Sequence, residues 1–354
     1  KMTLFLQTDA VVSNFISDIS GLKNLDYFMN ADFANQKYKL NGNDATFSDL
    51  FDYTRSGNAY QFDGTKINTI AANTPVFGDY VADDGGLWTT SIMGNLFGNG
   101  AQTTTKTTTI AARVDQIASL IVWGSGSVTL SGDVEEVNSG GLTASQGHPI
   151  QFKFKANITT PTSSVVTSTV IGSIINYQAA TDAPYFANQP TLATVQQASM
   201  FLKQSILSQL SNFTLLVRIK PYFIAPPVVP IRFFEIDSNY NAVSVRNNLQ
   251  RLMSVRLSDG ANTIDTAGEE NTGEIVVAVS YSAGMMKVFS NGETKGQLAG
   301  NAASVLANIQ LLNTTKYTDG TSSKPFAGLL KNVVIYKKSL NDDELKKLSL
   351  SYKW

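Results

Sequence analysis

Alternation of apolar and polar residues is the feature that most constrains how this chain can fold. Every second residue is apolar in residues 150–155, 213–220 and 275–281. In the first two of these runs, most of the residues between the apolar positions are polar. A period of two is the pattern of a β-strand that buries one face. The sequence therefore predicts a chain built mainly from half-buried strands.

Composition supports an all-β chain. Only 16% of residues are charged and 26 are glycine, while threonine, serine and asparagine are abundant. Threonine suits a pleated surface, and glycine and asparagine supply the positive φ angles of hairpin turns. Cysteine is absent, which excludes disulfides, cysteine-ligated zinc and thiol catalysis. A length of 354 residues predicts two or three domains.

Charge and hydropathy limit the partners. With 27 basic and 28 acidic residues, the net charge of -1 provides no basic field for nucleic acid or an anionic membrane. The apolar run at residues 4–6 is too short for a signal peptide, and no run reaches the roughly 18 apolar residues of a membrane span. We expect a soluble protein with no nucleic-acid partner, no membrane insertion and no visible export signal.

Shifts in composition divide the chain into four parts. Residues 1–45 have mixed periodicity and are predicted to serve attachment or oligomerisation. Residues 46–104 combine a hairpin-like segment with glycine-rich loops and end in a threonine run. Residues 105–189 are strand-rich, and a second strand-rich block covers residues 190–354.

Turn and cap signals predict local structure in both strand-rich parts. Residues 117–132 suggest two strands joined by a Gly-Ser-Gly turn, and residues 275–290 a hairpin that leads into an Asn291-Gly292 turn. Asn341, with Glu344 three residues later, predicts a capping box that starts a helix of one or two turns.

The segment 52–77 predicts a second hairpin. Residues 59–62 and 66–70 can pair across Asp63-Gly64, a turn that tolerates positive φ. Arg55 is the only cation between Lys39 and Lys66, and its guanidinium can satisfy backbone carbonyls or stack on a neighbouring aromatic ring. We interpret the segment as a structural clasp, with a ligand site as the alternative.

This segment resembles one found in bacteriophage tail-fibre and head-fibre proteins, the virion-decorating proteins. The resemblance lies in a Tyr-Thr-Arg-Ser opening, an aromatic residue with an Asp-Gly turn, and an Ala-Asn-x-Pro-x-Phe close. The matching positions are Tyr53, Thr54, Arg55, Ser56, Asp63, Gly64, Ala72, Asn73, Pro75 and Phe77. Residues 120–132 resemble the small jelly-roll module that often follows. Residues 213–221, 287–293 and 326–348 resemble a concanavalin A/laminin-G-like sandwich.

The resemblance implies a fold and a function. The expected fold is all-β, with tandem antiparallel β-sandwich (jelly-roll) modules, the last of them concanavalin A/laminin-G-like, after a small mixed N-terminal region. The expected protein is a virion fibre or decoration protein, on the head or tail appendage, made in the host cytoplasm. Its partners would be other virion proteins through the N-terminal region and a bacterial surface glycan. A homo-oligomer is expected, since fibres of this kind are most often trimers.

Catalytic motifs are absent from the sequence. His148, the only histidine, precedes a proline in a predicted loop, and no nucleophile elbow, metalloprotease helix or phosphate loop is present. Paired carboxylates of a glycosidase could still form from distant residues. We therefore expect no catalytic residues, no cofactor and no metal, with a polysaccharide-degrading enzyme as one alternative function and a purely structural decoration protein as the other.

Sugar binding needs exposed aromatic faces and polar side chains on loops held by a rigid scaffold. The loops 257–273 and 313–325 offer such residues, although plain solvated loops are the alternative. The predicted carbohydrate-binding residues are Asp259, Asn262, Asp265, Tyr317, Asp319 and Trp88.

Overall fold

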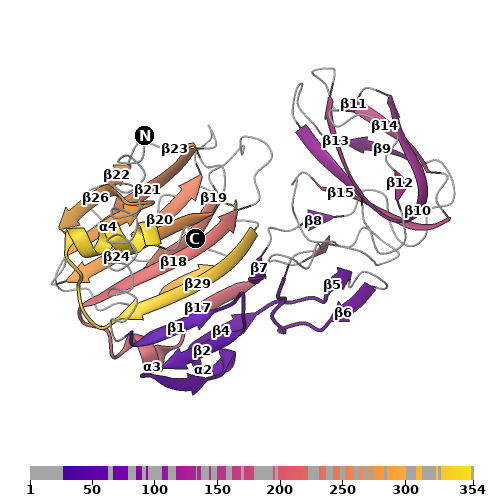
Figure 1. Cartoon of the computed structure of the whole chain (residues 1–354). Helices are drawn as coiled ribbons and strands as arrows, with labels where there is room; N and C mark the ends of the chain where they lie inside the picture. The colour runs from indigo at the N-terminus through magenta and orange to yellow at the C-terminus, as the bar shows by residue number, and fades with distance from the viewer. Residues whose placement is uncertain are drawn as a thin grey trace, which may run out of the picture.

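The structure is a computed structural model that contains a two-layered β-sandwich (Figure 1). It describes residues 27–62, 67–78, 85–89, 93–94, 106–110, 117–132, 134–136, 143–144, 150–156, 162–168, 171–178, 194–195, 198–221, 231–236, 242–247, 252–258, 263–265, 269–270, 274–282, 285–299, 308–312, 324–325 and 328–351. The sheets are almost entirely antiparallel, which confirms the predicted all-β class.

One layer, sheet A, has the strand order β26-β25-β24-β18-β29-β1-β2-β3, and β7 also pairs with β29. Its strands are β1 (Met29–Asp32), β2 (Lys37–Leu40), β3 (Asn43–Ala45), β7 (Leu87–Thr89), β18 (Phe213–Pro221), β24 (Ile275–Ser282), β25 (Met285–Ser290), β26 (Glu293–Ala299) and β29 (Gly328–Tyr336).

The other layer, sheet B, has the order β22-β21-β20-β19-β27-β17-β4, with β23 on β21 and β28 on β19. Its strands are β4 (Phe51–Thr54), β17 (Ser199–Leu202), β19 (Ile231–Ile236), β20 (Ala242–Asn247), β21 (Leu252–Ser258), β22 (Thr263–Asp265), β23 (Glu269–Glu270), β27 (Ile309–Leu312) and β28 (Lys324–Pro325).

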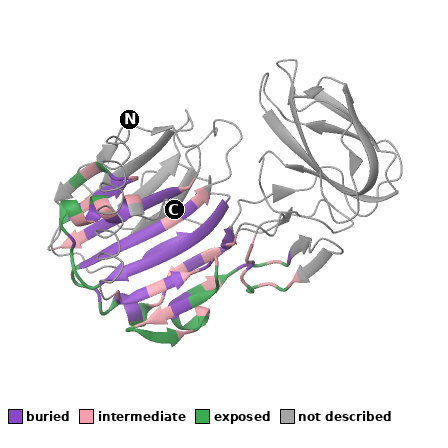
Figure 2. Ribbon diagram, viewed as in Figure 1, coloured by how far each residue is buried: buried purple, intermediate pink, exposed green. Residues whose placement is uncertain are grey.

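The period-two pattern decides which residues enter the core. Alternate apolar residues of β18 and β24 belong to the main cluster of buried side chains, as the sequence predicts. The same cluster includes Met200, Ile309 and Leu311 from sheet B, so it fills the space between the layers. Figure 2 shows the central strands of sheet A as the most continuously buried part of the described chain.

The sandwich is not confined to the predicted block 190–354. Strand β1 pairs with β29 over four residues, and β4 pairs with β17. The N-terminal strands of residues 29–54 therefore complete both sheets. They include part of the region 1–45 that the sequence suggested for attachment.

Aromatic rings explain why this N-terminal part packs so firmly. Phe33 is fully buried and lies 5.5 Å from Phe51 and 6.2 Å from Phe47, centroid to centroid. Phe47 also meets Tyr53 and Phe77 edge-on, at 5.9 and 6.1 Å. The short helix α2 (Phe47–Leu50) begins with a capping box, in which the Asp49 carboxylate accepts from the Thr46 backbone N–H at 2.7 Å.

A separate seven-stranded sheet forms between the two parts of the sandwich in sequence and is drawn as a body of its own in Figure 1. It comprises β9 (Lys106–Ile110), β10 (Ile117–Gly132), β11 (Val134–Glu136), β12 (Thr143–Ala144), β13 (Ile150–Ala156), β14 (Thr162–Ser168) and β15 (Ile171–Gln178). Before and after it, β8 (Met93–Gly94) pairs with β16 (Thr194–Val195). The two connections to this sheet therefore run side by side, so the sheet belongs to an inserted module.

Two expected turns have different outcomes. The predicted Gly-Ser-Gly turn is wrong, because β10 is one strand of 16 residues whose register shifts between Trp123 and Ser125. A glycine inside a strand often marks such an irregularity rather than a turn. The Asn291-Gly292 turn is confirmed, with φ of 50° and 84° between β25 and β26.

The structure describes two further helices. Helix α3 (Gln204–Leu207) follows β17, and α4 (Asp342–Ser351) is longer than the predicted one or two turns. Leu345 and Leu348 of α4 are fully buried against the outer face of sheet A. None of the helices in the described ranges is long and apolar enough to cross a membrane.

Candidate functional site

The predicted sugar-binding loops are attached at opposite ends of sheet B. Asp259 and Asn262 belong to the connection between β21 and β22, which leaves the sheet at Ser258, next to the end of β19 at Ile236. Tyr317 and Asp319 belong to the connection between β27 and β28, and β28 pairs with the start of β19 at Ile231. These four residues lie outside the described part of the chain, so their role stays a prediction.

Asp265 and Trp88 lie within the described strands. Asp265 is in β22, directly opposite Arg256 of β21. Trp88 is in β7, donates its backbone N–H to the Val76 carbonyl at 2.8 Å, and is only 3% exposed. Its ring is therefore packed inside the protein and does not offer the open face that a sugar platform requires.

Arg55 ties the segment 52–77 together. The Arg55 guanidinium donates through Nε to the Gly57 carbonyl at 2.9 Å and through Nη2 to the carbonyls of Ile70 and Ala71 at 3.3 and 2.8 Å. The Arg55 backbone N–H donates to Asn73 Oδ1 at 3.0 Å, and the Asn73 N–H returns a bond to the Arg55 carbonyl at 3.1 Å. These contacts are those expected of the structural clasp.

Burial perturbs the two titratable groups of this clasp. Arg55 is only 2% exposed, and desolvation lowers the pKa of its guanidinium. Burial also raises the pKa of the Tyr53 hydroxyl, and the neighbouring guanidinium opposes that shift.

Most of the remaining clasp residues lie in the described part of the chain, and two lie outside it. The predicted pairing is confirmed, because β5 (Ala59–Phe62) and β6 (Ile67–Ile70) form an antiparallel ladder. Asn73 has a positive φ of 59°, and Pro75 follows it in the described chain. Asp63 and Gly64 lie outside the described residues.

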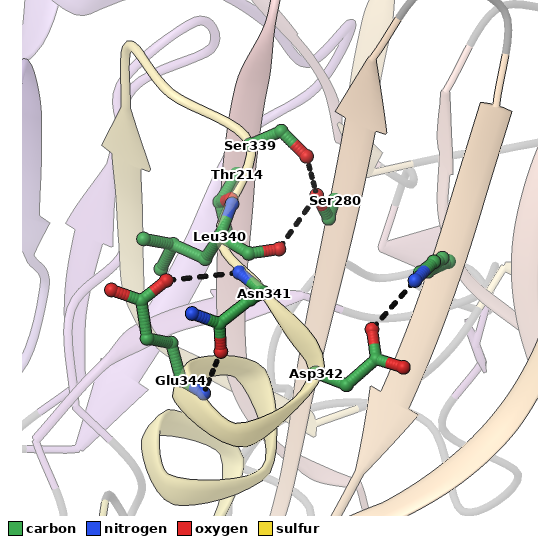
Figure 3. A network of polar contacts seen from close by, with 8 residues as sticks. Thr214, Ser280, Ser339, Leu340, Asn341, Asp342 and Glu344 are labelled. Atoms are coloured by element: carbon green, nitrogen blue, oxygen red, sulfur yellow. Dashed lines mark hydrogen bonds and ion pairs between the residues drawn. The ribbon is translucent and has the colours of Figure 1, made fainter.

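A polar network fixes α4 to sheet A (Figure 3). Asn341 Oδ1 accepts from the Glu344 N–H, and Glu344 Oε2 accepts from the Asn341 N–H, both at 2.9 Å, so the predicted capping box is confirmed. The Thr214 hydroxyl donates to the Lys338 carbonyl at 2.9 Å and accepts from the Leu340 N–H at 3.0 Å. The Thr214 bonds hold the segment before α4 on sheet A, and the Asn341–Glu344 bonds cap the helix, which favours a structural role for Asn341 and Glu344.

One row of directly opposite residues crosses the whole of sheet B. In the direct cross-strand register, the row comprises Asp265, Arg256, Ser244, Glu235, Gln310, Phe201 and Asp52. At the β27–β17–β4 end of the row, the residues next in the chain point into the core. These neighbours are Phe51, Met200, Leu202, Ile309 and Leu311. Asp52, Phe201 and Gln310 therefore lie on the face away from the core. We call the whole row the outer row.

On the same strands, Arg232 of β19 is directly opposite Arg246 of β20, which is directly opposite Ser254 of β21. Sequence reasoning missed both the outer row and the Arg232–Arg246 pair. Strand alternation predicts which residues share a face, but only the pairing register shows which of them are neighbours.

Among the described residues, no group of histidine, cysteine, aspartate and glutamate is placed to hold a metal ion. The acidic pair Asp342–Asp343 lies in the first turn of α4, where carboxylates complement the helix dipole.

Comparison with known proteins supports the fold of the C-terminal part. Residues 196–346 match the family model described as the concanavalin A-like lectin/glucanases superfamily, which spans less than half of the chain. A search of curated proteins found no match.

Solved structures with a partly similar fold are distant. The CBM40 domain of the Ruminococcus gnavus IT-sialidase, bound to α2,6-sialyllactose, aligns with 41% of this chain and 86% of its own, at 17% identity and a TM-score of 0.32. The leech intramolecular trans-sialidase aligns over 42% of this chain and 25% of its own, at 15% identity and a TM-score of 0.32. The Trypanosoma rangeli sialidase aligns over 43% and 26%, at 15% identity and a TM-score of 0.34. The strand pairing and the family match together establish that the C-terminal region contains a concanavalin A-like sandwich.

Proposed function

We propose that this chain binds carbohydrate through its concanavalin A-like sandwich and acts in adhesion rather than catalysis. The observation that carries the proposal is the match of residues 196–346 to the lectin/glucanase superfamily. Support comes from the scaffold, whose two sheets share one buried apolar core that can hold loops in place.

We further propose that the protein is a virion fibre or decoration protein that attaches a bacteriophage to a bacterial surface glycan. The support is the resemblance of residues 53–77 to phage fibre proteins. In that setting, oligomerisation would display several copies of a weak site, and linked copies raise avidity by roughly 10² to 10⁴. In that setting, the N-terminal region would contact other virion proteins.

The test is adsorption of the fluorescent, purified full chain to intact bacterial cells, with and without soluble surface polysaccharide. The full chain is needed because the block 190–354 lacks strands β1–β4 and β7 of the sandwich. We expect adsorption that the polysaccharide competes away. Adsorption to no strain, together with no binding on a glycan array, would refute carbohydrate binding and favour a purely architectural role in the virion.

A further inference from the structure

The turn between β2 and β3 is an exposed asparagine–glycine pair, Asn41-Gly42. Leu40 is directly opposite Asn43, so the turn has two residues, and both have positive φ, 50° and 77°. Apart from the chain neighbours, a Cβ built on Gly42 would meet no heavy atom within 4 Å. The turn therefore stands free at the end of sheet A where β3 is the edge strand.

An asparagine that precedes glycine can lose its side-chain amide without an enzyme. The glycine backbone nitrogen attacks the asparagine Cγ, so a new C–N bond forms and the bond from Cγ to the side-chain nitrogen breaks. That nitrogen takes the proton of the attacking amide and leaves as ammonia, and a succinimide ring remains. Water then adds to either ring carbonyl, its proton goes to the ring nitrogen, and the ring opens to aspartate or isoaspartate. Glycine favours the attack because it has no Cβ in the way.

Both reacting groups of the Asn41-Gly42 turn are unengaged. Within the described part of the chain, neither the Gly42 N–H nor the Asn41 side-chain amide makes a hydrogen bond. The Asn41 backbone is anchored, because its N–H donates to the Phe28 carbonyl at 2.8 Å and its carbonyl accepts from Asn43 Nδ2 at 3.3 Å. An exposed turn on an edge hairpin opens locally at low cost, so Gly42 N can reach the Asn41 side chain.

The Asn291-Gly292 turn has the same two residues and a similar backbone, with φ of 50° and 84°, but its reacting groups are held. Gly292 is buried, and its N–H donates to Ser349 Oγ of α4 at 2.8 Å. Asn291 Oδ1 accepts from the Val276 N–H at 3.4 Å. Attack in this turn requires that both bonds break and that the α4 contact opens.

We propose that Asn41 is a site of spontaneous deamidation in the folded protein and that α4 protects Asn291 from the same reaction. The inference goes beyond the proposed carbohydrate binding and does not depend on it. The product has a new carboxylate at the tip of the β2–β3 hairpin. Its isoaspartate form also adds a methylene to the backbone of the turn, which should disturb the register of β3, an edge strand of three residues.

The test incubates the full chain in mildly alkaline buffer, folded and, in parallel, unfolded in urea. Digestion with trypsin at mildly acidic pH releases residues 40–55, which contain Asn41, and residues 288–295, which contain Asn291. Tandem mass spectrometry then locates and times each deamidation. We expect similar rates at the two sites in urea. In the folded chain Asn41 should react roughly thirtyfold faster than Asn291, because two hydrogen bonds must break at Asn291 and each slows its reaction about fivefold.

Ser349→Ala is the matched variant, because it removes the acceptor of the Gly292 N–H. It should speed deamidation of Asn291 about fivefold and leave the rate at Asn41 unchanged. A variant that simply unfolds would instead bring both sites to their rates in urea.

The proposal fails if Asn41 stays intact in the folded chain under conditions that modify it in urea. Equal rates at Asn41 and Asn291 in the folded chain would also overturn it. A slow, unchanged rate at Asn291 in a folded Ser349→Ala chain would refute the protection by α4.

Discussion

Phe33 offers a quantitative test of whether the N-terminal strands belong to the same folding unit as the C-terminal block. Its side chain is fully buried, with ring centroids 5.9 Å from Tyr38, 6.2 Å from Phe47 and 5.5 Å from Phe51. Replacing a buried phenylalanine by alanine costs about 3–5 kcal/mol through lost burial and the cavity that remains. A domain of this size loses about 2–4 °C in unfolding temperature per kcal/mol. Phe33→Ala should therefore lower the unfolding temperature of the sandwich by about 6–20 °C.

Differential scanning calorimetry of the full chain would measure this shift, with two reference variants. Val333→Ala, in the fully buried centre of β29, identifies the sandwich transition because it must move the same peak. Met285→Ala removes a side chain that is 39% exposed and should change the stability by no more than about 0.5 kcal/mol. A Phe33→Ala shift below about 2 °C, or a separate N-terminal transition, would refute a shared core.

Three further predictions concern local structure. Asn341→Ala removes the cap of α4 and should destabilise the protein by about 1 kcal/mol in urea unfolding, whereas an unchanged midpoint would show that the cap contributes nothing. Gly292→Ala should cost about 1–3 kcal/mol, because φ is 84° and the new Cβ would lie 2.8 Å from Leu350 Cδ1; a wild-type urea midpoint would contradict the packing of α4. Hydrogen bonds from Thr46 lower the pKa of the Asp49 carboxyl in the folded protein. The ionised carboxylate therefore stabilises the fold above the ordinary aspartate pKa of about 3.9, and this stabilisation is lost as the pH falls through the lower pKa of the folded protein. Carboxyl NMR should find that lower pKa, and an ordinary value would refute the capping box.

The sequence was sufficient to predict strands where alternation is strong. The inward faces of β18 and β24, the Asn291-Gly292 turn and the Asn341–Glu344 cap were all predictable because each depends on residues close together in the chain. The clasp role of Arg55 was also open to prediction, since a lone arginine among aromatic residues has few other partners.

Long-range pairing could not be predicted from local patterns. Nothing in residues 29–54 specifies that β1 must join β29, about 300 residues away, or that β8 and β16 must close the inserted module. The Arg232–Arg246 pair illustrates the same limit, because a shift of register by one residue would put the two residues on opposite faces.

Hydrogen–deuterium exchange of the full chain, with and without a saturating amount of the tightest-binding oligosaccharide from the array, tests the proposed binding by the sandwich most directly. Slower exchange is expected in peptides of the sandwich, and unchanged exchange in residues 106–178. Protection confined to residues 106–178 would place the binding site in the inserted module and contradict the account.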